Sequence, residues 1–381
     1  MGCALFHNCG GCSFRELDIK TYRVQKEKQV KTFLEEKLGD LSTVWQSPVF
    51  LDDGTRRRAA FVFEYKKQKL FFGFNENKSH QIVDVSKCLM VTEKINNSLE
   101  DLKGLISSLC AIVVQKKIKG KRFETEQILS GDLEVLEAEN GLDVVLETQV
   151  PLGLEHRMEI CDFMNEHEAF IRFSWRKKHA FEAEPILEKT KPFIKIGGVD
   201  VFVAPGDFLQ ASKEGERALV KLVVDGVSKV RGNVADLFCG IGTFSYALSE
   251  LKGNKVLAVD VSKSLLKNFQ NTIDKQMIQN IQIQEKNLFL YPLTAEELTG
   301  LDVIVFDPPR AGAKAQVKEI CRIEKDKRPE IIVAVSCNPE TFAFDAQKLL
   351  EGGYVIEKMT MVDQFVYSNH SEIVCVFTNE K

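Results

Sequence analysis

Residues 234–245 of the chain read VADLFCGIGTFS, and this stretch decides the fold of the second half. Apolar residues up to Leu237 predict a short buried strand, and Gly240 and Gly242 predict a sharp turn into a helix that begins at Thr243. A turn of this kind leaves room for a ligand at the carboxyl end of the strand. The G-x-G spacing alone also fits an ordinary strand-to-helix turn, so it needs support from other strands.

The strand ends that follow provide this support. KVLAVD ends on Asp260, where a carboxylate can accept hydrogen bonds from both hydroxyls of a ribose. VIVFDPPRAG places Asp307 and Arg310 after a third strand, and SCNP places Cys337 after a fourth. Ligands of open parallel sheets bind outside the carboxyl ends of the strands, so we expect these segments to share one crevice. The pattern predicts a nucleoside-bearing cofactor.

The distribution of strand and helix patterns predicts three segments. Valine- and isoleucine-rich strands alternate with helices over 205–381, which predicts an α/β, doubly wound, Rossmann-like domain. Residues 44–204 contain alternating runs such as LDVVLET and FIRFSW, with a hairpin turn at 139–141, and these predict an α+β domain with half-buried antiparallel strands. Residues 1–43 combine a cysteine-rich start with a helix over 16–38. Two further helices are expected, near 95–114 and 155–166.

Composition restricts where the chain acts. No apolar run is long enough to cross a membrane, and the start MGCALFHNCGGCSF lacks the features of a signal peptide, so we expect a cytoplasmic, monomeric protein with no membrane partner. The cytosol keeps thiols reduced, so the ten cysteines point to metal binding or catalysis rather than to disulfides. The net charge of -4 gives no support for nucleic-acid binding by the chain as a whole.

Several motifs together resemble one family. DLFCGIGTFS, DPPRAG, SCNPET and the terminal His370-Ser371-Glu372 are similar to the RNA 5-methyluridine methyltransferases, which have the class I AdoMet-dependent fold. The combination of DPPR, SCNP and H-x-E is specific, whereas most methyltransferases share the glycine motif. The resemblance covers essentially the whole chain. It implies an enzyme that transfers a methyl group from AdoMet to C5 of a uridine in RNA.

The resemblance also implies roles for individual residues. Cys337 matches the nucleophile that adds to C6 of uracil, and Glu372 matches the general base that removes the proton from C5. His370 is expected to help position Glu372. The residues implied to bind or face the cofactor are Gln210 (in the F-x-Q motif that starts at Phe208), Phe238, Gly240, Gly242, Thr243, Asp260, Asn287 and Asp307.

This chain departs from the family pattern at three places. Ser212 stands where asparagine is usual, and Asp260 stands where glutamate is usual. The terminal pattern D-M-F-P-x-T-x-H-x-E reads DQFVYSNHSE over 363–372, and the proline is lost. The predicted nucleophile and base remain. The changed loop leaves the choice of substrate open.

Three cysteines lie close together at the N-terminus. Cys3, Cys9 and Cys12 have the spacing C-x5-C-x2-C, and Cys88 follows further along the chain. Four thiolates suit either a [4Fe-4S] cluster or a tetrahedral zinc ion, and the residue types do not choose between them. The family resemblance favours the [4Fe-4S] cluster, with a structural role.

The implied partner is RNA rather than DNA. The family resemblance and the very early cysteines favour the short type that modifies 23S rRNA, with tRNA as the alternative substrate. A catalytically idle RNA-binding iron-sulfur protein is a further alternative, and intact Cys337 and Glu372 argue against it. RNA contact is expected in the first half of the chain, which contains four basic clusters, one of them beside Trp175. The clusters are Arg56–Arg58, Lys66 with Lys67 and Lys69, Lys116–Arg122, and Arg176–Lys178.

Overall fold

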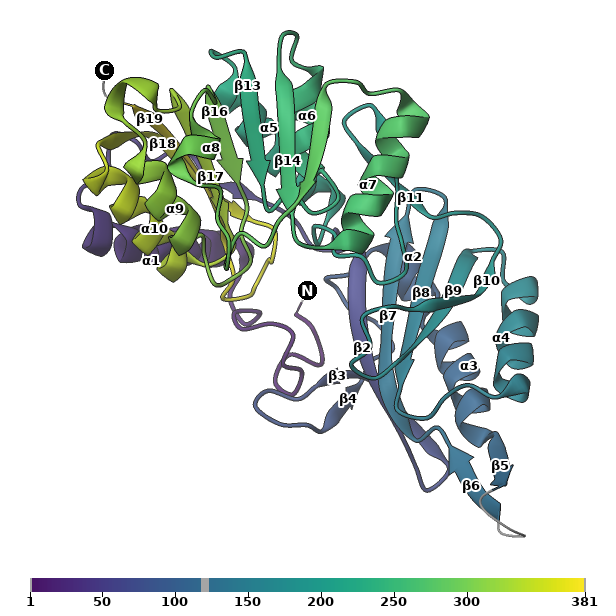
Figure 1. Ribbon diagram of the computed structural model, residues 1–381. Helices are drawn as coiled ribbons and strands as arrows, with labels where there is room; N and C mark the ends of the chain where they lie inside the picture. The colour runs from purple at the N-terminus through teal and green to yellow at the C-terminus, as the bar shows by residue number, and fades with distance from the viewer. Residues whose placement is uncertain (1, 118–122, 380–381) are drawn as a thin grey trace. The chain divides into compact units, whose positions relative to one another are not determined.

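The computed structural model describes residues 2–117 and 123–379 (Figure 1). The chain forms two compact units, each built from separated segments. The first unit comprises Met1–Glu16, Asp52–Ile194 and Phe202–Ser212, and the second comprises Leu17–Leu51, Lys195–Val201 and Lys213–Lys381. This division differs from the expected segments 1–43, 44–204 and 205–381. The helix that follows the cysteine-rich start packs on the last helix of the second unit, so it belongs there.

The second unit contains an eight-stranded sheet in the order β1-β18-β19-β17-β16-β13-β14-β15. Its strands are β1 (Val49–Phe50), β13 (Asn233–Leu237), β14 (Lys255–Asp260), β15 (Ile281–Glu285), β16 (Val303–Phe306), β17 (Ile331–Ser336), β18 (Tyr354–Asp363) and β19 (Glu372–Asn379). β13 to β17 run parallel, while β19 is inserted antiparallel between β17 and β18. The predicted doubly wound sheet is confirmed, and its carboxyl edge collects the ends of β13, β14, β16 and β17.

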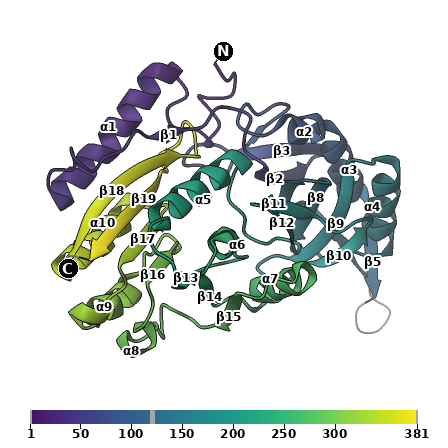
Figure 2. The same cartoon turned by 90° about the horizontal axis from the view of Figure 1, so that it is seen from above.

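Helices cover both faces of this sheet (Figure 2). They are α1 (Ile19–Leu38), α5 (Lys213–Val227), α6 (Thr243–Glu250), α7 (Lys263–Gln276), α8 (Ala295–Leu298), α9 (Lys314–Arg322) and α10 (Pro339–Glu351), with a 3-10 turn at Lys325–Lys327. α10 packs on β17, β18 and β19 with α1 and α9 beside it, and α5 packs on the same three strands. β11 (Phe193–Ile196) and β12 (Val199–Phe202) form a separate pair. Among the described helices, none is long and apolar enough to span a bilayer.

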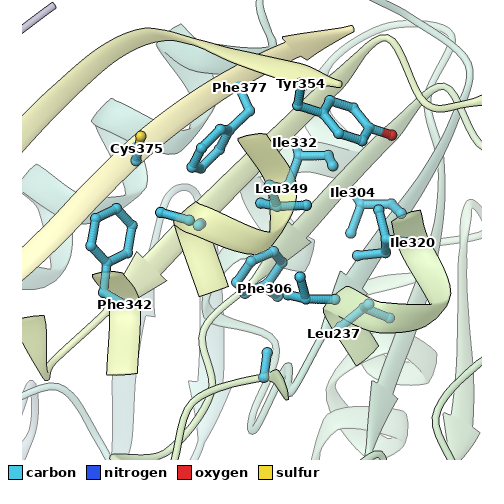
Figure 3. Packing of buried hydrophobic residues seen from close by; sticks show 14 of the residues in the cluster. Leu237, Ile304, Phe306, Ile320, Ile332, Phe342, Leu349, Tyr354, Cys375 and Phe377 are labelled. Atoms are coloured by element: carbon cyan, nitrogen blue, oxygen red, sulfur yellow. The ribbon is translucent and has the colours of Figure 1, made fainter. Parts of the chain in front are cut away.

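A hydrophobic core of the second unit lies between the sheet and helices α1, α9 and α10 (Figure 3). Alternate residues of the central strands, such as Ile304, Phe306 and Ile332, pack against Leu349 of α10 and are at most 1% exposed. The intervening strand residues are buried too, so the strands are apolar on both faces. This burial explains why the parallel strands read as continuous apolar runs.

The first unit contains a seven-stranded sheet in the order β10-β9-β8-β7-β2-β3-β4. Its strands are β2 (Arg58–Lys66), β3 (Lys69–Asn75), β4 (Ile82–Asp84), β7 (Ser130–Ala138), β8 (Gly141–Thr148), β9 (Phe170–Lys177) and β10 (Glu184–Glu188). The accompanying helices are α2 (Glu93–Asn97), α3 (Leu99–Ala111) and α4 (Leu154–Glu166), and β5 (Val113–Lys117) pairs with β6 (Phe123–Gln127). The hairpin predicted at 139–141 is confirmed.

One pairing differs from the expected antiparallel pattern, because β8 and β9 run parallel. The helix α4 between them returns the chain to the same end of the sheet, as parallel pairing requires. β8 is also almost entirely buried rather than half-buried. Ala204, Gly206 and Asp207 line a small pocket with Asp143 and Val145 of β8, so this segment lies over the strand.

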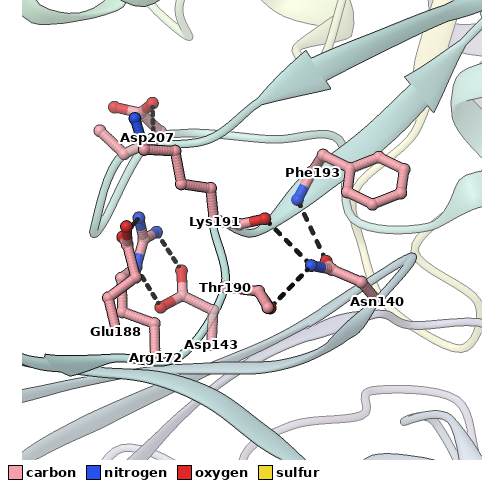
Figure 4. A network of polar contacts seen from close by, with 9 residues as sticks. Asn140, Asp143, Arg172, Glu188, Thr190, Lys191, Phe193 and Asp207 are labelled. Carbon is pink, nitrogen blue, oxygen red and sulfur yellow. Dashed lines mark hydrogen bonds and ion pairs between the residues drawn. The ribbon is translucent and has the colours of Figure 1, made fainter.

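A buried ion pair joins β8 to β9 (Figure 4). Arg172 donates from Nε and Nη2 to the two carboxylate oxygens of Asp143, at 2.8 and 2.7 Å, and both side chains are 3% exposed. Glu188 of β10 lies 3.3 Å from the same guanidinium. Two parallel hydrogen bonds satisfy the buried charges, so the pair fixes the register of these strands.

Candidate active site

The turn after β13 has the backbone shape expected of a ligand-binding loop. Phe238, Gly240 and Gly242 have φ values of 61°, 56° and 91°. Gly242 is required by packing, because a Cβ there would lie 2.4 Å from the ring of Phe269. A Cβ at Gly240 would meet nothing within 4 Å, so the loop leaves open space on that side. The positive φ of Phe238 is unusual for a bulky residue, and such conformations cluster at functional sites.

Two carboxylates hold this turn in place. Asp260, at the end of β14, accepts hydrogen bonds from the backbone N–H groups of Gly240 at 3.0 Å and Ser262 at 2.9 Å. Asp236 is fully buried and accepts a hydrogen bond from the hydroxyl of Ser245 at 2.5 Å, and burial raises its pKa to about 7. Its other oxygen has no partner among the described residues, as expected if a ligand completes the site.

Asn287 organises the turn after β15. Its side-chain oxygen accepts from the N–H groups of Phe289 at 3.0 Å and Leu290 at 3.2 Å. The Phe289 ring lies 5.3 Å from the ring of Phe238, so the turns after β13 and β15 meet. Cofactor contacts by Asn287, Phe238, Asp260 and Thr243, the first residue of α6, stay predictions, and their common location agrees with them.

Cys337 and Glu372 are brought together by strand register. β17 pairs with β19 through Ser336 and Ile373, so the next opposed positions are Cys337, directly after β17, and Glu372, the first residue of β19. Asp307 directly follows the neighbouring strand β16. Glu372 is only 4% exposed, although its position at the start of a strand also suited a solvent-exposed carboxylate.

The two loops that carry Asp307 and Cys337 are tied to each other. The side chain of Asn338 donates to the backbone carbonyl of Arg310 at 3.2 Å, and Thr341 donates to the same carbonyl at 3.2 Å. Asn338 also caps α10 by accepting from the N–H of Glu340 at 3.0 Å, and Pro339 occupies the first helical turn. Cys337 is therefore held at a rigid junction between strand and helix.

The acidic groups around Cys337 have raised pKa values. Burial raises the pKa of Glu372 to about 8, and the nearby charge of Asp307 adds to this increase. Burial likewise raises the pKa of Asp307 to about 7. The pKa of Cys337 rises to about 11, because the thiol is partly buried and faces the charges of Glu372 and Asp307, which Arg310 opposes. Titratable groups perturbed in this way are typical of catalytic sites.

The hydrogen bond to Glu372 comes from Gln364, a residue that sequence analysis quoted without a role. Gln364 Nε2 lies 2.9 Å from Glu372 Oε1, and both residues are buried. His370, expected to help position Glu372, has a ring nitrogen 3.1 Å from Arg310 Nη2 instead. The only sequence signal for Gln364 was that it stands where the family pattern has methionine.

Gln210 belongs to the first unit, unlike the other residues predicted to bind the cofactor. Its backbone carbonyl accepts from Nε of Arg57 at 3.1 Å, and the neighbouring Ser212 forms an isolated bridge with Arg56. These contacts fix the backbone of the F-x-Q segment. The predicted contact between the Gln210 side chain and the cofactor stays a prediction.

The arginines predicted to bind RNA are largely engaged within the first unit. Arg56 lines the pocket of the N-terminal cysteines, and Arg57 is 4% exposed. Arg58 and Arg176 both form ion pairs with Glu134, at 2.9 and 2.6 Å. Among the side chains that the structure describes, the exposed cations of these clusters are the lysines Lys66, Lys67, Lys69, Lys177 and Lys178. In the cluster Lys116–Arg122, residues 118–122 lie outside the described residues.

The four predicted metal ligands, Cys3, Cys9, Cys12 and Cys88, line one pocket of the first unit. The N–H of Gly11 lies 3.4 Å from the sulfur of Cys9. The side chain of Asn96 forms two hydrogen bonds with the backbone of Cys88. It accepts from the N–H at 2.8 Å and donates to the carbonyl at 2.9 Å. Over residues 2–117 and 123–379, no group of three or more His, Cys, Asp or Glu side chains is arranged to hold a metal ion.

Comparisons of the sequence agree with this site. A family described as tRNA (uracil-5-)-methyltransferase matches residues 200–380. An uncharacterized RNA methyltransferase of Brucella melitensis is 33% identical over 99% of this chain and 83% of its own length. The 23S rRNA (uracil(1939)-C(5))-methyltransferase RlmD of Photorhabdus laumondii is 27% identical over 99% of this chain and 82% of its own length.

A solved structure has the same fold over nearly the whole chain. The tRNA (uracil-54, C5)-methyltransferase of Pyrococcus abyssi, in complex with S-adenosyl-L-homocysteine, superposes with a TM-score of 0.74 at 22% identity, covering 97% of this chain and 86% of its own. The fold agrees with the relatives that match nearly the whole chain. The chain therefore belongs to the RNA (uracil-C5)-methyltransferase family, whose members are AdoMet-dependent enzymes, and it is an enzyme of this class.

Proposed function

We propose that this enzyme methylates C5 of a uridine in 23S rRNA through a covalent adduct between Cys337 and C6 of the ring. The observation that carries the mechanism is the strand register, which sets Cys337 opposite Glu372 with Asp307 on the adjacent strand end. A thiol and a buried carboxyl group are the groups that this reaction requires, and Asp307 lies beside them.

The proposed steps balance without any further reactant. The Cys337 thiol gives its proton to solvent, and the thiolate adds to C6 of uracil, which shifts electron density through the ring to C5. C5 then takes the methyl group, and the ring carries both a methyl group and a hydrogen at that carbon. Glu372 removes this proton as a general base, and the electrons of the broken C–H bond re-form the C5–C6 double bond as the thiolate leaves.

The residues after β13, β14 and β15 fit the cofactor AdoMet. Gly240 leaves open space, and Asp236 has a buried oxygen without a partner among the described residues. We expect Phe238, Gly240, Gly242, Thr243, Asp260 and Asn287 to hold the cofactor. When bound, AdoMet supplies an electrophilic methyl group on a positively charged sulfur. This chain's residues orient the cofactor, exclude water and move the proton.

A 23S rRNA target is supported by the 27% identical relative whose name states that activity. The family description and the similar solved structure name tRNA, which makes tRNA the alternative. In either RNA the uridine must leave its stack to reach Cys337, so an unpaired or easily melted segment is expected. The exposed lysines of the first unit are candidates for phosphate contact.

Mapping 5-methyluridine in RNA from cells with and without the gene tests the target. We expect a uridine in 23S rRNA to lose its methyl group in the deletion strain and to regain it with the wild-type gene. Complementation with a Cys337→Ala gene should leave the uridine unmethylated. Loss of methylation confined to tRNA would overturn the 23S assignment. Unchanged methylation in both RNAs would support the idle-protein alternative.

We also propose that Cys3, Cys9, Cys12 and Cys88 bind a [4Fe-4S] cluster. The four thiols line one pocket of the first unit. A cluster takes one thiolate per iron, so it does not need four sulfurs around a single ion. The N–H of Gly11 near the Cys9 sulfur is a contact that often accompanies such ligands.

Anaerobically purified protein should contain about four iron atoms per chain. Replacing Cys12 or Cys88 with serine should remove most of this iron and lower the melting temperature, because metal binding contributes to folding. The control is Cys161→Ala, which removes a partly buried thiol of α4 away from the pocket. Metal analysis, visible absorption and thermal unfolding measure these effects. Stoichiometric zinc without iron would rule out the cluster.

A further inference from the structure

The proposed base Glu372 is held from one side by Gln364. Gln364 directly follows β18 and is 3% exposed, and its amide donates to Oε1 of Glu372 at 2.9 Å. An amide is a donor that carries no charge, so it can hold a carboxylate without neutralising it. The second oxygen, Oε2, is left to act on a substrate.

The segment that carries Gln364 is fastened to α1 at both of its ends. Asp363, directly before Gln364, accepts from the hydroxyl of Tyr22 at 2.7 Å. The ammonium group of Lys26 donates to the carbonyls of Ser368 and His370, the latter at 2.8 Å, and lies 3.9 Å from Asp363. Lys26 is 2% exposed and Asp363 is fully buried. Gln364 therefore lies in a loop that buried polar contacts hold in place.

We propose that Gln364 is a positioning residue for methyl transfer, fixing one oxygen of Glu372 so that the other takes the proton from C5. This inference rests on the proposed role of Glu372. The hydrogen bond has a second consequence, because a donor to the ionised carboxylate favours that form and lowers the pKa of Glu372. Methionine, the residue in the family pattern, cannot donate, so we attribute this effect to Gln364 in particular.

The charged and titratable groups near Glu372 come from several elements. Asp307 and Arg310 follow β16, Cys337 follows β17, and Asp363 with Lys26 forms the buried pair at the end of β18. Asp307 raises the pKa of Glu372, whereas Arg310 and Gln364 lower it. Replacing Gln364 leaves these charges unchanged and removes the hydrogen bond from its amide to Glu372.

The test is Gln364→Met in the full-length enzyme, with the breakdown of the methylated adduct measured as a function of pH in single turnovers. The adduct forms before this step, so ionisation of the Cys337 thiol does not affect it, and a base works in its ionised form. The breakdown should therefore speed up with pH through the pKa of Glu372. Without the hydrogen bond this rise should move to higher pH by about one unit, which is about a tenfold slower breakdown below the rise. The rate should return towards the wild-type value at alkaline pH. Trapping by RNA containing 5-fluorouridine should stay unchanged, because it requires no proton removal.

A matched control is Gln316→Met, which removes another fully buried glutamine whose side chain bonds the backbone of Leu293. It should leave the pH profile in place. Gln364→Leu provides a second variant if the methionine variant folds poorly. An unshifted profile, or a breakdown slowed equally at every pH, would overturn the positioning role. Normal turnover by Glu372→Gln would instead overturn the proposed base.

Discussion

Replacing Cys337 with alanine should reduce methyl transfer by at least about 10⁴-fold, because the uracil ring then has no nucleophile to activate C5. Binding of AdoMet should be retained, since the glycine loop after β13 is untouched. The RNA should also still bind. Single-turnover methyl transfer and equilibrium binding measure the two effects separately.

The same variant should fail to form a covalent complex with RNA that contains 5-fluorouridine. In the wild-type enzyme the fluorine at C5 cannot leave as a proton does, so the adduct accumulates and can be seen as a band of reduced mobility. Cys321→Ala is the matched control, because it removes another partly buried thiol of the second unit, on α9. Trapping by Cys321→Ala and not by Cys337→Ala is expected. Unchanged methylation by Cys337→Ala would exclude the covalent mechanism.

The fold of the second unit could be predicted because its signals are local. Buried parallel strands must be apolar on both faces, so KVLAVD and IIVAVS are visible as strands in the sequence alone. Residues at or directly after the end of a parallel strand lie at the carboxyl edge of the sheet. The sequence therefore predicted that Asp260, Asp307 and Cys337 lie in one crevice.

The features that could not be predicted depend on long-range packing. No local pattern shows that α1 belongs with α10, because the chain leaves the second unit at Leu51 and returns much later. The parallel pairing of β8 with β9 follows from the direction in which α4 returns the chain, whereas their alternating sequences suit antiparallel pairing equally well.

The charge clusters, which were used to predict RNA contact, were the least informative of the sequence patterns. Arg56, Arg57 and Arg58 are consecutive, yet their side chains lie in three different places. They line the cysteine pocket, bond the carbonyl of Gln210 and pair with the carboxylate of Glu134, in that order. Successive residues of an extended chain point to opposite faces, so a run of like charges does not predict a single patch. The contact of Gln364 with Glu372 could not be predicted for a related reason. The path of the loop between β18 and β19 brings the two side chains together, and no local pattern shows that path.

Replacing Glu372 with glutamine should separate methyl transfer from product release. The amide keeps the shape of the side chain and can still accept the hydrogen bond from Gln364, but it cannot remove the proton from C5. Cys337 would still add to C6, and C5 would still take the methyl group. The methylated adduct could not break down, so we expect it to accumulate on ordinary uridine RNA.

Turnover by Glu372→Gln should fall by roughly 10²- to 10⁴-fold, the range typical of a lost general base. In the wild-type enzyme the breakdown of the methylated adduct should speed up with pH towards the Glu372 pKa of about 8, and the variant should lose this dependence. Denaturing electrophoresis of enzyme mixed with radiolabelled RNA shows the adduct, and mass spectrometry shows its methyl group. A variant that releases 5-methyluridine at the wild-type rate would assign the proton removal elsewhere. Asp307, with a pKa raised to about 7 in the same site, would then become the leading candidate.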